Sequence, residues 1–236
     1  MKTILILSAM LDEMNQLACK YFKTNICKKG EFVEVQYKKN KIFLYVLGIG
    51  KKNVQKSLKK IEKDIHKFDL IFFIGIAGAI SKDLRVGDII VPCNLITQTG
   101  KTIQLNGLLK ECLNYNGALL SSDNFVSKAE KQKFANIFIE LSAVDMEDFF
   151  IAEYIMKLSR KIIVIKTISD SYNSILPDEN FLIKNYRYKD IKTQFKNLIH
   201  DPYNSLKMSF FKINIKKAIK KNSKFVFKII EEYSSV

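Results

Sequence analysis

Short apolar runs alternate along this chain with segments whose apolar residues recur at helical spacing. This alternation indicates an α/β sheet rather than a helical bundle or a β-sandwich. The expected strands cover residues 3–8, 31–38, 41–47, 70–75, 88–91, 118–121, 142–144 and 162–168, the second and third forming a hairpin. The expected helices cover residues 12–22, 51–66, 106–115, 127–136 and 147–158.

The last quarter of the chain has a different pattern. A polar loop is expected over 171–186, and the apolar residues from 204 to 232 follow helical spacing with lysines between them. This pattern predicts one or two amphipathic helices. Because the 236 residues contain no repeat and no low-complexity linker, we expect a single domain over 1–236, with 181–236 as its basic helical part.

The net charge of +15 suggests a polyanionic partner, but its composition and distribution argue against nucleic acid. Only three of the 39 basic residues are arginines, the residue that base and phosphate recognition favours. Residues 181–236 hold 13 basic and 4 acidic residues, a net +9. We therefore expect no nucleic-acid partner. The basic part either contacts an anionic membrane surface or packs its apolar face on the sheet with its lysines in solvent.

The cysteines and histidines give no sign of a metal or redox site. The four cysteines lack CxxC spacing and the two histidines lie far apart in sequence, so we expect no metal and no cofactor. The first apolar run is too short for a signal peptide, and no window is long enough to span a membrane. The expected location is the cytoplasm, with peripheral contact at the inner membrane as an open alternative.

Acidic residues follow three of the expected strands, where open α/β sheets bind their ligands. They are Asp12 and Glu13 after the first strand, Asp145 and Glu147 after a strand near the middle, and Asp170 after the last. Each taken alone could also be a helix cap or a solvated carboxylate. Glycines cluster at 48–50 and 75–78 without the spacing of a dinucleotide or P-loop motif. A glycine-rich turn from strand to helix would let the backbone approach a sugar or an anion, and tight packing is the alternative.

Several pieces of the sequence, taken in order, resemble the purine nucleoside phosphorylase and methylthioadenosine/adenosylhomocysteine nucleosidase superfamily. They are SAMLDEM at 8–14, LGIGKKN at 47–53, FFIGIAGAI at 72–80, LRVGDIIVP at 84–92, SSDNF at 121–125, AVDMED at 143–148 and IKTISDS at 165–171. The resemblance implies a three-layer α/β/α fold around a mixed, partly barrel-like twisted sheet. It also implies a homodimer that cleaves the bond between ribose and a purine.

The resemblance assigns catalytic roles to three of these acidic residues. Asp170 would protonate N7 of the purine, which requires a raised pKa, and Ser169 would hold that acid. Glu147 would bind the ribose hydroxyls, and Glu13 would position and deprotonate the attacking water.

The resemblance also assigns substrate contacts. Met146 would pack on the ribose, Phe125 would stack on the purine, and the backbone of Val126 would read the purine edge. Ala77 and Gly78 would bring the backbone close to the substrate. For Met146 and Phe125, ordinary core packing is an equal alternative.

The nucleophile separates a hydrolase from a phosphorylase. A phosphorylase needs clustered cations, usually arginines, and neither glycine cluster contains one. Lys51, Lys52 and Arg85 could hold phosphate only if the fold turned them inward. Hydrolysis is therefore favoured, with phosphorolysis as the alternative and a non-catalytic nucleoside- or membrane-binding protein as the alternative of another class.

Departures from the nucleosidase pattern bear on the substrate. Asp145 stands where methylthioadenosine nucleosidases usually carry glutamate, Ile76 replaces their serine, and Lys166 stands where arginine is frequent. The sequence is more similar to the hopanoid-associated branch, which shares AVDME, a loop like SDSYNSILP and a basic C-terminal region. The expected substrate is an adenine nucleoside resembling methylthioadenosine, adenosylhomocysteine or adenosylhopane.

Overall fold

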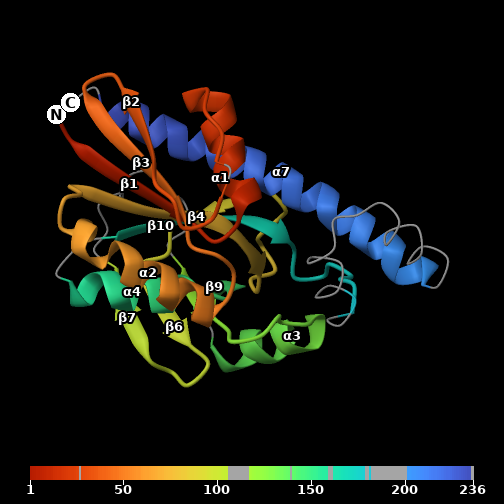
Figure 1. Cartoon of the computed structure of the whole chain (residues 1–236). Coiled ribbons are helices and arrows are strands. Elements are labelled where there is room, and N and C mark those ends of the chain that lie inside the picture. Colours follow the sequence, from red (N-terminus) through yellow and green to blue (C-terminus); the bar gives the residue numbers. More distant parts are fainter. Residues whose placement is uncertain are drawn as a thin grey trace.

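A mixed sheet forms the centre of the protein (Figure 1). The computed structural model describes residues 1–26, 28–105, 117–138, 140–158, 162–178, 181 and 201–234. Within these ranges the strands are β1 (Thr3–Ser8), β2 (Val33–Tyr37), β3 (Asn40–Val46), β4 (Leu70–Ala79), β5 (Ile89–Ile90), β6 (Asn94–Thr97), β7 (Thr102–Gln104), β8 (Ala118–Ser121), β9 (Leu141–Asp145) and β10 (Ile162–Asp170). The helices are α1 (Leu11–Leu17), the π-helix η1 (Ala18–Phe22), α2 (Lys51–Ile65), α3 (Lys128–Ile137), α4 (Asp148–Lys157) and α7 (Pro202–Tyr233).

The sheet changes partners along β4. On one edge of β4, residues 70–74 pair in parallel with β1, whereas Gly78 and Ala79 pair antiparallel with β9. On the other edge, β10 runs parallel to β4 over most of its length. The sheet therefore opens between β1 and β9, beside residues 75–77 of β4.

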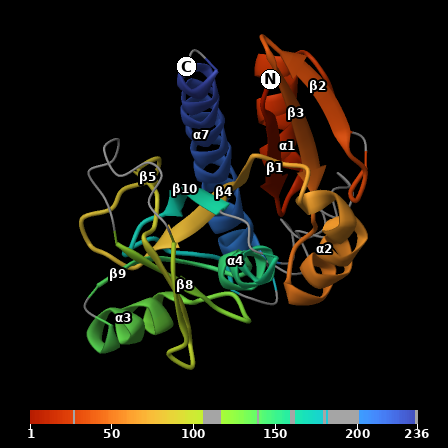
Figure 2. The ribbon, with the colours of Figure 1, turned by 90° about the vertical axis from the view of Figure 1, so that its left-hand side faces the viewer.

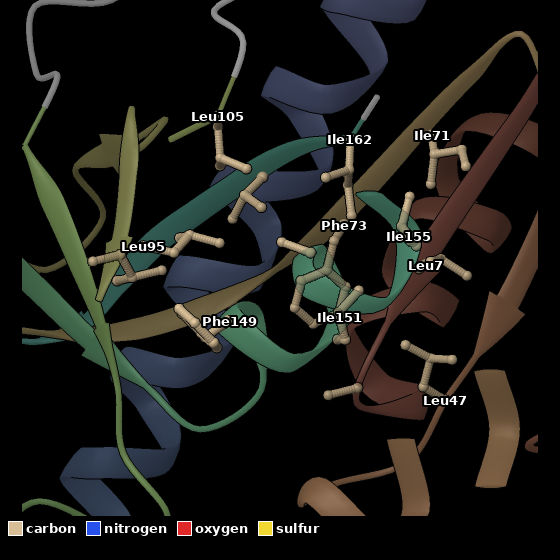
Figure 3. Close-up of a cluster of buried hydrophobic side chains, with 14 of the residues drawn as sticks. Leu7, Leu47, Ile71, Phe73, Leu95, Leu105, Phe149, Ile151, Ile155 and Ile162 are labelled. Carbon is tan, nitrogen blue, oxygen red and sulfur yellow. The ribbon is translucent and has the colours of Figure 1, made fainter. Parts of the chain in front are cut away.

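Helices cover both faces of the sheet, as expected for three layers (Figure 2). Side chains alternate along β1, so Leu5 and Leu7 pack toward α2 and α4 while Ile4 and Ile6 pack toward α1 and α7. Figure 3 shows part of the hydrophobic core on the face of the sheet covered by α2 and α4. Helix α4 contributes Phe149, Ile151 and Ile155 to this core. Helix α3 packs separately near β8.

The expected α/β class and mixed sheet are confirmed, with local differences. Strand β4 extends to Ala79, so the second glycine cluster lies inside a strand and the expected strand-to-helix turn there is wrong. A Cβ on Gly78 would lie 2.8 Å from Asp170 Oδ2, which explains why glycine interrupts the apolar run. The short strands β6 and β7 were not predicted, and the expected helix over 106–115 lies outside the described residues.

The C-terminal part contains one long helix, α7. Its 32 residues correspond to about 48 Å at 1.5 Å per residue. One face packs on the sheet, where the Asn222 carboxamide donates to the carbonyls of Gly75 (3.0 Å) and Ile165 (3.2 Å). Among the described segments, no helix combines the length and the apolar character needed to cross a bilayer.

Candidate active site

Charged side chains gather where the sheet opens beside β4, although most of the surrounding residues are apolar. Burying several charges together is costly unless they pair or take up protons, so such a cluster marks a functional site. All of its members are less than a tenth exposed: Glu13, Lys131, Asp145, Glu147, Asp148, Lys166 and Asp170. Among the described residues, no group of three or more His, Cys, Asp or Glu side chains could hold a metal ion.

Glu13 lies in the first turn of α1, directly after β1. Its Oε2 accepts a hydrogen bond from the Met10 N–H (3.0 Å), and its Oε1 accepts one from the Ile76 N–H (3.2 Å). Ile76 belongs to the part of β4 that lies between its pairings with β1 and β9. Burial raises the pKa of Glu13 to about 7, against the opposing charge of Lys166. Glu13 can therefore gain and lose a proton near neutral pH.

Glu147 lies at the start of α4, after β9. Its Oε1 accepts a hydrogen bond from the Gly50 N–H (2.8 Å), which ties the first glycine cluster to the site. Burial, and next the charge of Asp145, raise the pKa of Glu147 to about 7. Glu13 and Glu147, whose pKa values are both raised to about 7, thus lie on opposite sides of the opening, one after β1 and one after β9.

Lys166 of β10 is the cation at the centre of the cluster. Its Nζ lies 3.0 Å from Asp148 Oδ1 and 3.3 Å from Asp145 Oδ2. Burial alone would lower the pKa of Lys166, but the nearby carboxylates, Asp148 first, raise it above its ordinary value. Burial and the charge of Asp145 raise the pKa of Asp148 well above its usual range.

Asp145 also fixes the start of α4. Its Oδ2 accepts hydrogen bonds from the backbone N–H groups of Glu147 (3.1 Å) and Asp148 (3.0 Å). Its Oδ1 accepts one from Ser121 Oγ (2.8 Å). Asp145 therefore acts as a helix cap that orients Glu147. Asp148 was not among the residues predicted for the site, since an acidic residue in a first helical turn usually faces solvent.

Asp170 lies at a β-bulge at the end of β10. The pairing register shifts there, with Ile168 opposite Ala77 and Asp170 opposite Gly78. Ser169 Oγ donates to Asp170 Oδ1 (2.7 Å), the contact predicted for this pair. Bulges next to active sites redirect a side chain, and this one turns Asp170 toward Gly78.

A second cation, Lys131, was missed by the sequence analysis. It lies on α3, is 2% exposed, and its Nζ donates to Asp170 Oδ2. A Cβ on Gly78 would lie 2.9 Å from Lys131 Nζ, so a larger residue at this position would require the ammonium group to shift. Both oxygens of Asp170 thus have donors, Ser169 on one and Lys131 on the other.

The apolar residues predicted to contact substrate lie in different packing environments. Val126 is buried against the core near α3, and Ala77 is buried in β4. Phe125 is half-buried and packs against the apolar face of α7 near Phe181. Met146 is half-buried between Asp145 and Glu147.

Comparisons with known proteins identify the family of this chain. Residues 3–107 match the phosphorylase superfamily. The chain is 32% identical over 195 residues to the 5′-methylthioadenosine/S-adenosylhomocysteine nucleosidase of Buchnera aphidicola, covering 70% of this chain and 84% of that protein. The chain belongs to the phosphorylase superfamily. Within this superfamily it is also 28% identical over 127 residues to an aminodeoxyfutalosine nucleosidase of Helicobacter pylori, covering 43% of this chain and 55% of that protein.

Solved structures of the superfamily share the fold. A 5′-methylthioadenosine/S-adenosylhomocysteine nucleosidase from Helicobacter pylori superposes with a TM-score of 0.72 at 21% identity, covering 98% of each chain. At this identity the likeness establishes the fold alone.

Proposed function

We propose that this protein hydrolyses the N-ribosidic bond of a 5′-substituted adenine nucleoside and releases adenine. The observation that carries the proposal is the burial of Glu13, Glu147 and Asp170 in a chain of the phosphorylase superfamily. Glu13 lies beside Gly75 and Asp170 beside Gly78 of β4, and Glu147 is close to Glu13. These carboxylates come from three separate strand ends. A purely structural role for each would not require them to converge.

In the proposed reaction, Glu13 takes a proton from water while the water oxygen bonds to C1′ of the ribose. The bond from C1′ to N9 breaks, its electron pair passes to the purine, and N7 takes a proton from Asp170. Glu147 binds the ribose hydroxyls and favours the positive charge that develops on the sugar. Glu13 then releases its proton to solvent. Asp170, which pairs with Lys131 as a carboxylate, takes up a proton from solvent before each turnover.

The remaining predicted residues have supporting roles in this proposal. Ser169 holds Asp170, as its 2.7 Å hydrogen bond supports. Met146 packs on the ribose, Phe125 stacks on the purine, and the Val126 backbone reads its edge. Ala77 and Gly78 let the β4 backbone approach the substrate.

Water is the proposed nucleophile rather than phosphate. Lys51, Lys52 and Arg85, the cations considered for a phosphate site, are all exposed. The cations that do reach the site, Lys131 and Lys166, already pair with carboxylates. A phosphate dianion would therefore meet a surplus of negative charge.

Release of free adenine tests the proposal. We expect the purified protein to release adenine from methylthioadenosine, adenosylhomocysteine or a 5′-alkyl adenosine without added phosphate. Chromatographic detection of adenine, with and without phosphate, is the measurement. Strict phosphate dependence would make the protein a phosphorylase, and no adenine from any of the substrates would favour a non-catalytic nucleoside-binding protein.

The 5′ substituent and the oligomeric state stay predictions. The relatives described above are named for methylthioadenosine, adenosylhomocysteine and aminodeoxyfutalosine, and none of these names indicates the hopanoid branch. An adenosylhopane-like nucleoside therefore belongs in the same assay as an untested substrate. Sedimentation of the purified protein tests the expected homodimer.

A membrane-contacting role for the C-terminal part has one supporting observation. Apolar side chains at three- and four-residue spacing form an exposed stripe on α7. Two lysines, Lys207 and Lys216, are close to this stripe in the sequence. The stripe comprises Tyr203, Leu206, Phe210 and Ile213. The combination of exposed apolar side chains and lysines suits an anionic lipid surface.

Vesicle sedimentation tests this role. We expect binding to anionic vesicles at low ionic strength that weakens in high salt, because part of the attraction is screened. The double variant Phe210→Ser, Ile213→Ser should bind less, whereas Ile137→Ser, an exposed position on α3, serves as the matched control. Absence of binding at low salt would leave α7 as a helix that only packs on the sheet.

A further inference from the structure

Lys131 places an ammonium group at the end of the site where the purine is proposed to bind. A buried lysine is uncommon unless it is paired, and here the partner is the proposed acid, Asp170. Lys131 also lies near Phe125 and Val126 in sequence, the residues proposed to contact the base. Lys131 therefore contacts the proposed acid in space and follows the proposed base contacts in the chain.

The capping of α3 fixes where Lys131 points. Ser127 and Glu130 form a capping box, in which the Ser127 N–H donates to Glu130 Oε2 (2.8 Å) and Ser127 Oγ accepts from the Glu130 N–H (3.4 Å). This arrangement sets the first turn of the helix directly after Val126. Lys131 follows in that turn and faces inward, whereas Lys128 and Lys133 are exposed.

The hydrogen-bonding edge that a purine presents at N7 also includes the group at position 6. In adenine this edge has an acceptor at N7 and a donor amino group, whereas a 6-oxopurine has acceptors at both N7 and O6. A carboxyl group alone can complement adenine, since it can donate to N7 and accept from the amino group. An ammonium group has only donors, so it complements the oxygen and opposes the amino group.

We propose that Lys131 selects the group at position 6 of the base, so that the site cleaves 6-oxopurine nucleosides at least as well as the matching adenine nucleosides. This inference rests on the proposed function, because it requires Asp170 to face N7. With one hydrogen bonded to Asp170, the ammonium of Lys131 keeps two others for O6. Lys131 is accordingly the residue that discriminates between an oxygen and an amino group at position 6, while Asp170 remains the proton donor to N7.

A matched pair of substrates tests the proposal. For wild-type protein we expect kcat/KM for 5′-methylthioinosine to equal or exceed that for 5′-methylthioadenosine. In Lys131→Met the ratio of the two values should fall about 10- to 100-fold, the usual range for one base-reading contact. Lys128→Met, on the exposed side of the same helix, should leave the ratio unchanged. An equal loss with both substrates would overturn the proposal, since a merely structural lysine would act on both.

A second measurement covers the case in which Lys131→Met does not fold, because removing one partner of a buried ion pair is destabilising. Calorimetric titration of wild-type protein with free hypoxanthine and free adenine compares the two bases directly. Hypoxanthine binding as tightly as adenine, or more tightly, is expected. A tenfold preference for adenine would overturn the role of Lys131. If neither nucleoside is cleaved, the proposed function fails, and the comparison of free bases still tests how Lys131 reads the base.

Discussion

Replacing Glu13 with glutamine is expected to lower kcat for adenine release by about 10²- to 10⁴-fold, the range for a general base. The amide has nearly the same shape but cannot take the proton from water. It also turns an NH₂ group toward either the Met10 or the Ile76 N–H, each of which now donates to a carboxylate oxygen. Initial rates of adenine release from Glu13→Gln at saturating substrate are the measurement.

The neighbouring carboxylate provides the control for this variant. Asp12 lies in the same turn of α1 but is exposed, so Asp12→Asn should keep rates within about twofold if the effect belongs to the buried base. Equal losses in both variants would point to damage to α1 instead. Full activity in Glu13→Gln would remove Glu13 from the mechanism.

The pH profile gives an independent check on Glu13. Because the pKa of Glu13 is raised to about 7, its ionised form is depleted as pH falls below 7. A base must be ionised to accept a proton, so kcat/KM of the wild-type protein should fall toward acid pH with a midpoint near 7. The pKa of Glu147 is also raised to about 7, so its protonation contributes to the same fall in kcat/KM toward acid pH. A profile that is flat from pH 5 to 8 would contradict both roles.

Replacing Lys166 with methionine is expected to lower the free energy of unfolding by about 3–5 kcal/mol, the cost of breaking a buried ion pair. Methionine fills much the same volume but leaves Asp145 and Asp148 without their cation. Urea denaturation at pH 8 measures the loss. At pH 5 the loss should be smaller, because Asp148, whose pKa is raised well above its usual range by burial, can then take up a proton in place of the missing charge.

An exposed pair provides the comparison for Lys166. Lys157 lies 3.4 Å from Glu153 on the surface of α4, and such pairs contribute little, so Lys157→Met should change stability by less than about 1 kcal/mol. A loss for Lys166→Met no greater than that for Lys157→Met would mean that the cluster does not depend on its central cation.

The sequence was sufficient to predict most strands of the sheet and the acidic residues at their ends, because apolar runs and the polar residues that end them are local patterns. It was insufficient for Lys131, since three lysines occur within the first six residues of α3 and only the packing of the helix shows which one is buried. Asp148 was missed for a related reason, because it resembles an ordinary first-turn acid. The short strands β6 and β7 mix polar and apolar residues and carry little periodic signal.

The C-terminal pattern predicted one or two helices, and the structure has one continuous helix, α7, over Pro202–Tyr233. The absence of proline and glycine between residues 203 and 233 could have indicated its continuity. Its register on the sheet depends instead on a contact far away in the sequence, between Asn222 and the strands that hold the site.

That contact can form only after the ribosome has made α7. Asn222 bonds the carbonyl of Gly75, which leaves the ribosome 147 residues earlier, so β4 waits for its last partner. At about 5–20 residues per second, this delay is roughly 7–30 s. Until then the carbonyls of Gly75 and Ile165 have no carboxamide to bind, so this part of the sheet is completed only when α7 has been made.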